Sequence, residues 1–177
     1  MNEQDEVDRI LSEWAAARPD LDIAPLSVFS RMTRITKHLD RTRVHAFERS
    51  GLASWEFDVL AVLRHGGAPF RQSPKVLVQQ TMVSSGTMTN RIDRMVDRGL
   101  VQRLTDPNDG RGVLVEMTAL GQTLVDAAMT RLTDAEERLL GTMSRAERDR
   151  LATLLRKLAL SVDRFEPATE PIDLPRF

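Results

Sequence analysis

Apolar side chains recur at helical spacing in two segments near the start of the chain. Residues 5–18 carry a short stripe that ends at Pro19, and residues 26–48 carry a longer one. The stripes consist of Val7, Ile10, Leu11 and Trp14 and of Phe29, Met32, Ile35 and Leu39. Because a one-sided apolar stripe needs another surface to cover it, both segments predict amphipathic helices that pack against a partner surface.

The next segment, residues 54–65, is apolar on several faces. Such a pattern is typical of a helix buried at the centre of a domain. Ser54 is predicted to cap this helix at its beginning, and Gly66 and Gly67 to end it.

Two further helices are predicted between residues 73 and 99. Ser73 and the proline that follows it predict the beginning of a short helix that ends near residue 80, since proline is favoured in the first turn. A second helix is predicted to begin at Ser84 or Ser85 and to run to residue 98. Gly99 is predicted to end it in the left-handed conformation.

The periodicity then changes to that of strands. Residues 100–104 and 112–117 read as two strands, and the turn-rich residues 105–111 between them predict a hairpin. Two short helices across a tight turn, followed by a hairpin, predict a winged helix-turn-helix. The predicted fold class is therefore mainly α with a small β-hairpin.

The last third of the chain returns to helical spacing. Residues 118–140 predict one helix, and Ser144 with Glu147 forms a capping box that opens a final one. The apolar stripe of the final helix consists of Leu151, Leu154, Leu155, Leu158 and Val162. The tail after Phe165 holds three prolines and is predicted not to be helical.

Composition narrows the function classes. The chain has 177 residues and no cysteine, which excludes disulfides, cysteine-based zinc sites and thiol redox sensing. No apolar run is long enough to span a membrane, and the acidic beginning does not resemble a signal peptide. A cytoplasmic protein with no membrane partner is expected.

Charge is unevenly distributed along the chain, although the net charge is only −1. Residues 71–111 hold seven basic and four acidic side chains, a net charge of +3, whereas the first 25 residues have a net charge of −5. The positive charge therefore lies on the predicted helix-turn-helix and hairpin, as expected for a protein that binds the phosphates of double-stranded DNA.

The helix that begins near residue 84 has two distinct faces when it is projected at about 100° per residue. Its apolar arc consists of Met88, Ile92, Met95 and Val96, and the opposite side of Gly86, Thr87, Asn90 and Arg94. An amide, a guanidinium, a hydroxyl and a glycine suit contacts with base edges and phosphates in a major groove. The alternative is an ordinary solvated face.

The hairpin tip supplies a second candidate contact. Arg111 is placed to reach a minor groove, and Asp109 to hold its guanidinium, although a structural salt bridge within the hairpin is the alternative. The positions predicted to contact DNA are Ser84, Ser85, Gly86, Thr87, Thr89, Asn90, Arg94, Arg103, Asp109 and Arg111.

Several motifs together resemble the MarR family of transcriptional regulators. They are SSGTMTNRIDRM at residues 84–95, GLV at 99–101, DPNDGRGV at 106–113 and LG at 120–121. The resemblance implies a homodimer that binds a pseudo-palindromic operator. It also implies three domains: N-terminal helices (residues 1–50), a winged helix-turn-helix (51–117) and C-terminal dimerisation helices with the tail (118–177).

Within that family, the chain resembles the PecS and urate-responsive branch, whose members are repressors released by urate or by related purine or phenolic anions. The resemblance implies an effector site that combines Trp14, Asp58 and Arg91 with a further basic position at Arg64 or His65. Other roles stay open for these residues: Trp14 in a dimer core, Asp58 in a salt bridge, Arg91 on a phosphate, and His65 as a helix-end residue.

The sequence contains no motif that is typical of an enzyme. No phosphate-binding loop, nucleophile elbow or metalloprotease motif occurs, and His38 and His45 lie two helical turns apart, too far to chelate a metal alone. Catalytic residues, metals and cofactors are therefore not expected. The alternative to an effector-released repressor is a constitutive winged-helix DNA-binding protein without an effector.

Overall fold

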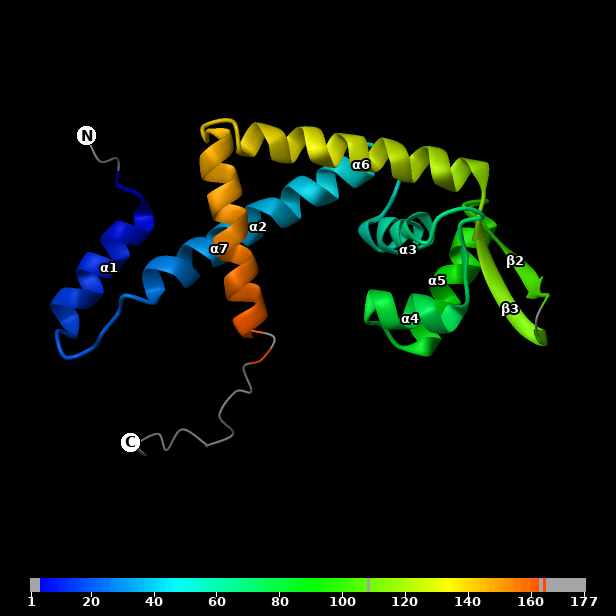
Figure 1. Cartoon of the computed structure of the whole chain (residues 1–177), viewed down its shortest axis with the longest axis horizontal. Coiled ribbons are helices and arrows are strands. Elements are labelled where there is room, and N and C mark those ends of the chain that lie inside the picture. The colour runs from blue at the N-terminus through cyan, green and yellow to red at the C-terminus, as the bar shows by residue number, and fades with distance from the viewer. Residues whose placement is uncertain (1–3, 108, 163, 165–177) are drawn as a thin grey trace, which may run out of the picture. The chain divides into compact units, whose positions relative to one another are not determined.

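A computed structural model describes residues 4–107, 109–162 and 164, apart from the side chains of residues 109–111. Its helices and strands are α1 (Glu6–Ala17), α2 (Leu26–Glu48), α3 (Ser54–His65), β1 (Arg71–Gln72), α4 (Pro74–Thr81), α5 (Ser85–Asp97), β2 (Val101–Asp106), β3 (Asp109–Met117), α6 (Ala119–Leu139) and α7 (Arg145–Val162) (Figure 1). Residues 1–136 and 137–177 form two compact units. The prediction for the tail after Phe165 lies outside the described residues.

The N-terminal helix α1 is attached to α2 by ion pairs. Asp5 accepts a hydrogen bond from the Asp8 amide and so caps α1. Arg31 of α2 donates to Asp5 at 2.8 Å and to Asp8 at 2.6 Å, and Arg34 pairs with Glu6. The hydrogen bond from Arg31 also lowers the pKa of the Asp5 carboxyl. These contacts join the beginning of α1 to the first half of α2.

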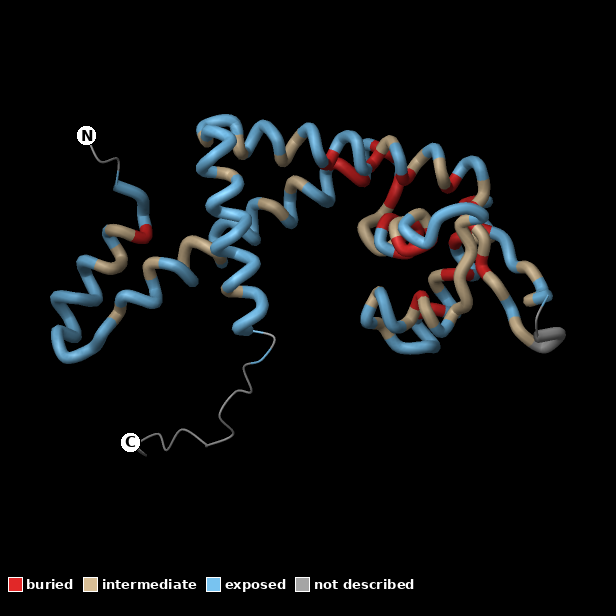
Figure 2. The backbone as a smooth tube through the Cα atoms, viewed as in Figure 1, coloured by how far each residue is buried: buried red, intermediate tan, exposed pale blue. Residues whose placement is uncertain are grey.

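Helix α3 forms the centre of the core, as its apolar pattern predicted. Val59, Leu60 and Leu63 have no exposed surface, and Phe57 stacks on Phe47 of α2 with ring centroids 3.9 Å apart. Figure 2 shows the buried positions gathered on α3, α5 and the adjoining part of α6.

The predicted cap of α3 is wrong. Ser54 is the first residue inside the helix, and Ala53 occupies the cap position. The Ala53 amide donates instead to the Glu56 carboxylate at 2.8 Å, so a side chain from within the first turn satisfies the free N–H.

Helices α4 and α5 form the helix-turn-helix and confirm the predicted capping residues. Ser73 accepts a hydrogen bond from the Val76 amide, and Ser84 accepts one from the Thr87 amide. The chain leaves α5 through Gly99, which has a φ of +67° in the left-handed region where glycine is favoured.

The wing is larger than the sequence predicted. Strands β2 and β3 extend into the predicted loop, so that Asp106 pairs with Asp109. The two-residue strand β1 adds a third strand beside β3, with Arg71 opposite Glu116. The predicted class, a mainly helical winged helix-turn-helix, is confirmed, and its hairpin is part of a three-stranded antiparallel sheet.

Helix α6 lies close to the end of α5 at Gly121. A Cβ atom on this residue would stand 2.3 Å from the Leu100 carbonyl oxygen, so only glycine fits. Helix α7 begins with the predicted capping box, in which Glu147 accepts from the Ser144 amide at 2.8 Å. No residue of α7 is buried, and Leu151, Leu154, Leu155 and Val162 of its apolar stripe are exposed.

Candidate nucleic-acid interface

The face of α5 predicted to read DNA is exposed. Met88, Ile92 and Met95 are buried against the core, which turns the opposite side of the helix toward solvent. Gly86, Thr87, Asn90 and Arg94 on that side are exposed, as are Ser84, Ser85 and Thr89. The division of α5 into a core face and a solvent face is therefore confirmed, whereas the DNA contacts of these residues stay a prediction.

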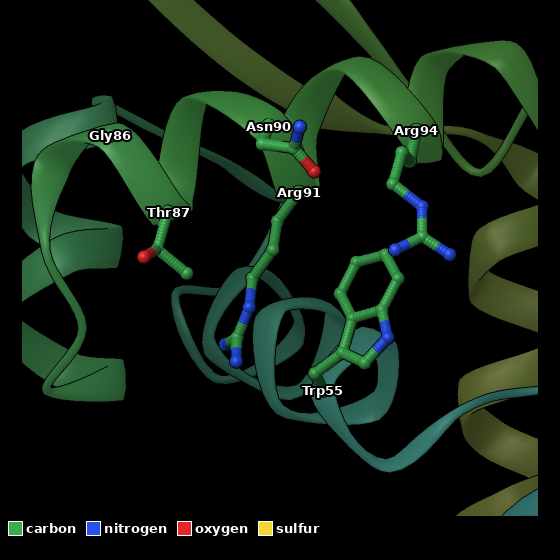
Figure 3. A pocket seen from close by; sticks show the side chains of 6 residues that line it. All are labelled: Trp55, Gly86, Thr87, Asn90, Arg91 and Arg94. Atoms are coloured by element: carbon green, nitrogen blue, oxygen red, sulfur yellow. The ribbon is translucent and has the colours of Figure 1, made fainter.

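A shallow cavity of about 450 Å³ lies on this exposed face (Figure 3). It is lined by Trp55 of α3 together with Gly86, Thr87, Asn90, Arg91 and Arg94 of α5. Four of these residues belong to the predicted DNA-contacting set, so the cavity lies within the candidate interface.

Trp55 lines this cavity in the candidate interface, and sequence reasoning missed it because it stands in the apolar run of α3. The Arg94 Cζ atom lies 5.0 Å from the indole centroid and the Arg91 Cζ atom 5.6 Å, within the range of cation–π contacts. A signal was present: Trp55 and Asp58 are three residues apart and share one helix face, and an aspartate marks that face as outward.

The C-terminal end of α5 is tied to α3 by an ion pair that the sequence also did not reveal. Arg98 donates to the Glu56 carboxylate at 2.5 Å and to the Gly51 carbonyl at 2.8 Å. The Glu56 side chain is only 2% exposed. The pair therefore fixes the end of α5 to the turn that precedes α3.

Of the three wing residues predicted to contact DNA, the structure describes the side chain of one. Arg103 is exposed and forms an ion pair with Asp93 of α5 at 2.7 Å, which links β2 to α5. The side chains of Asp109 and Arg111 lie outside the described part of the structure. Their contact with each other and with DNA stays a prediction.

Two of the five predicted effector residues come together. Asp58 of α3 and Arg91 of α5 interact electrostatically, and Arg43 of α2 acts on the same carboxyl. Partial burial among these elements raises the pKa of Asp58, and the two arginines oppose that rise. Arg91 therefore acts on the Asp58 carboxyl and also lies over the Trp55 ring.

Arg64 and His65 lie at the other end of α3, beside α6. Arg64 pairs with Asp126 at 2.9 Å and stacks on Phe70, and His65 is exposed. A cavity of about 270 Å³ runs along Arg64, His65 and Asp126.

Trp14 is 48% exposed near the end of α1. The contacts of α1 described above lie at residues 31 and 34 of α2, whereas Asp58 interacts with Arg43, which is 12 and 9 residues further along that helix. At 1.5 Å per residue these separations are about 18 and 14 Å. Within one chain, the structure does not bring Trp14 to Asp58.

Replacing Asp58 with asparagine is expected to raise the thermal stability slightly near pH 7. Because the folded-state pKa of Asp58 is raised above its ordinary value of 3.8, the charged carboxylate destabilises the folded form. The gain is below about 1 kcal/mol because neighbouring elements remove the carboxyl only partly from water, which still screens its charge. The stability gain should be fully present above the folded-state pKa of Asp58 and should vanish below pH 3.8, where the carboxyl is protonated in both the folded and the unfolded form. Thermal melts across this range test it, and a gain that persists in acid contradicts it.

Exposed polar and cationic side chains on the second helix of a helix-turn-helix, beside a three-stranded wing, define a winged-helix DNA-binding protein. Comparison with known proteins specifies the family. Residues 50–112 match the model of the MarR family. The chain is 33% identical to the transcriptional regulator PecS of Dickeya dadantii over 85% of this chain and 90% of that protein.

Comparison with solved structures also points to the MarR family. MarR from E. coli in complex with operator DNA has a TM-score of 0.61 at 28% identity, over 77% of this chain and 94% of that one. BpsR of Bordetella bronchiseptica, whose DNA binding is regulated by 6-hydroxynicotinic acid, has a TM-score of 0.55 at 28% identity, over 73% and 98% of the two chains. This chain belongs to the MarR family, and the predicted class, a DNA-binding transcriptional regulator, is confirmed, as is the likeness to PecS.

Two further findings concern the described residues. They contain no group of three His, Cys, Asp or Glu side chains that could hold a metal ion. None of their helices is long and apolar enough to cross a membrane.

Proposed function

We propose that this protein is a homodimeric, cytoplasmic repressor that binds a pseudo-palindromic operator and is released by a small planar or anionic effector. The observation that carries the proposal is the exposed face of α5, where Thr87, Asn90 and Arg94 project together from a helix anchored to the core. The proposal assigns no reaction and no cofactor to the chain.

Uncovered apolar side chains support the homodimer. Large apolar residues are exposed on helices outside the winged helix, among them α1, α2 and α7. They include Trp14, Phe29, Ile35, Leu151, Leu154 and Leu155. Exposed apolar surface of this kind marks protein interfaces, and a second copy of the chain would cover it. The three predicted domains, residues 1–50, 51–117 and 118–177, then separate dimerisation from DNA binding.

The effector site is proposed at Asp58 and Arg91, with Trp14 supplied by the partner chain, or along the crevice at Arg64 and His65. The first location is favoured because Arg91 belongs to α5 itself, so that a bound anion would act directly on the recognition helix. Regulation of the relative BpsR by 6-hydroxynicotinic acid supports an aromatic acid as the effector class. Release requires that the effector bind the form unable to hold DNA more tightly than the competent form.

Replacing Asn90 with alanine is expected to weaken operator binding about tenfold or more, since a bidentate amide-to-adenine contact contributes about 1–3 kcal/mol of discrimination. Affinity for random duplex should change little, because a base contact contributes nothing there. The measurement is a gel shift with an operator selected from a random duplex library. Gln122→Ala on α6, outside the predicted interface, is the matched control.

Two outcomes decide the proposal. A wild-type protein that shows no preference for any selected duplex over random DNA overturns the operator-binding role. Operator binding that no purine, phenolate or aromatic acid releases, with no thermal shift for any of them, favours the alternative of a constitutive winged-helix protein.

A further inference from the structure

Two arginines of α5, the predicted recognition helix, lie against one aromatic ring. Trp55 is partly buried on the first turn of α3 and packs against the core. Figure 3 shows the guanidinium groups of Arg91 and Arg94 beside this indole, on the side of α5 that also carries Thr87 and Asn90. The ring therefore stands at the base of the cavity in the candidate interface.

The two arginines beside this ring differ from other arginines of the winged helix in their ion-pair partners. Three other arginines of this region form ion pairs: Arg71 with Glu116, Arg98 with Glu56, and Arg103 with Asp93. Among the residues that the structure describes, none of the ion pairs within 4.0 Å includes Arg91 or Arg94. Among the described arginines of the winged helix, the two without such an ion pair thus lie together at Trp55.

The indole has a physical role in such a pair. Two guanidinium groups near one ring repel each other, and the negative face of an indole attracts both. Each arginine would otherwise lose about 1.5–2 kcal/mol of side-chain entropy when it is fixed by a ligand. A ring that already holds both groups lowers this cost, because the arginines are ordered before the ligand arrives.

We propose that Trp55 is a positioning residue that presents Arg91 and Arg94 together to the phosphodiester backbone of the DNA. This inference rests on the proposed operator binding by α5. A guanidinium fork matches phosphate oxygens, and phosphate contacts set the register of a protein on the duplex without reading sequence. Arg91 and Arg94 hold the backbone in this arrangement, and Asn90, which directly precedes Arg91 on the helix, reads the base edge.

The test compares Trp55→Leu, which removes the aromatic face, with Trp55→Phe, which keeps a weaker one. We expect operator affinity to fall about tenfold in Trp55→Leu and by an intermediate amount in Trp55→Phe. Random duplex should show the same loss, in contrast to Asn90→Ala, because a phosphate contact is independent of sequence. Equal affinity of all three proteins overturns the inference.

A double-mutant cycle separates positioning from a merely structural role. In an Arg91→Gln/Arg94→Gln background, Trp55→Leu should no longer weaken DNA binding, because the groups it positions are gone. Each arginine change should also lower the slope of log affinity against log salt by about one. If the penalties of Trp55→Leu and the arginine changes add in full, Trp55 acts only through the core, and the inference fails.

Phe70→Leu is the matched control, since it removes the other arginine-on-ring contact of the winged helix, that of Arg64, away from the predicted interface. It should change DNA affinity less than about twofold. Thermal melting curves show whether a loss of DNA affinity in any variant is caused by unfolding. A wild type that binds operator, with Trp55→Leu unchanged, overturns only this inference, whereas a wild type that selects no duplex overturns the proposed function itself.

Trp55 also offers a direct signal, because the chain has two tryptophans. In a Trp14→Phe background it is the sole indole, and its emission should change when operator is added. An emission that stays constant through saturation, as followed by anisotropy of labelled DNA, contradicts the placement of Trp55 at the phosphates.

Discussion

Leu154→Glu is expected to convert the protein into a monomer and to weaken operator binding by about 100-fold or more. Leu154 is 56% exposed in the single chain and lies on the apolar stripe of α7, none of whose residues is buried. A carboxylate in a covered interface has no partner, and its burial costs several kcal/mol, where each 1.4 kcal/mol is a factor of about ten. A monomer also loses the second recognition helix, and with it the second half-site.

Thr153→Glu is the matched control. It adds the same charge to the preceding position of α7, which faces about 160° away from the centre of the stripe. Analytical ultracentrifugation should find Thr153→Glu dimeric and Leu154→Glu monomeric, with the helix content of both retained by circular dichroism. If Leu154→Glu stays dimeric with full operator affinity, the dimer does not form through this stripe.

The sequence was most informative where structure is determined locally. The beginnings of α1, α4, α5 and α7 are each marked by a polar side chain that accepts a nearby amide, and such a signal needs only three or four residues. The apolar arc of α5 likewise predicted its buried face, and from that the exposed residues opposite. Periodicity and capping together were sufficient to predict the winged helix.

Elements that depend on distant partners could not be predicted in this way. Strand β1 has two residues and no alternation of its own, and it exists because β3 pairs with it some 43 positions later, at residues 72 and 115. Glu56 likewise looks like an ordinary polar residue of α3, although it is buried against Arg98. Contacts of this kind become visible only once the fold is formed.

The candidate site was predicted in part for the same reason. The exposed residues of α5 follow from one helix projection, whereas the role of Trp55 depends on how α3 crosses α5. The ion pairs of Arg98 and Arg103 also reduce the positive charge that is available to DNA, because carboxylates of the same domain balance these two arginines. The net charge by segment therefore predicted the region of the candidate interface, and the structure shows which of its described arginines have no ion pair within 4.0 Å.

Arg98→Met is expected to lower the free energy of unfolding by about 3 kcal/mol, the lower end of the cost of breaking a buried ion pair. The reason is the unequal burial of the pair: the Glu56 side chain is 2% exposed, and that of Arg98 is 45% exposed. Removal of Arg98 leaves the buried carboxylate with the Ala53 amide, whereas removal of Glu56 leaves an arginine that water can solvate. Glu56→Met should therefore cost less, although the amide at the beginning of α3 loses its acceptor.

The double variant Glu56→Met/Arg98→Met should be more stable than Arg98→Met alone, because no unpaired charge is then buried. Urea unfolding at a fixed protomer concentration measures all three variants, since the stability of a dimer depends on that concentration. The double variant should nevertheless bind operator more weakly than the wild type, because the Arg98 bond to the Gly51 carbonyl also ties down the end of α5. If the two single costs simply add, Glu56 and Arg98 are not coupled, and their ion pair does not hold the end of α5 in place.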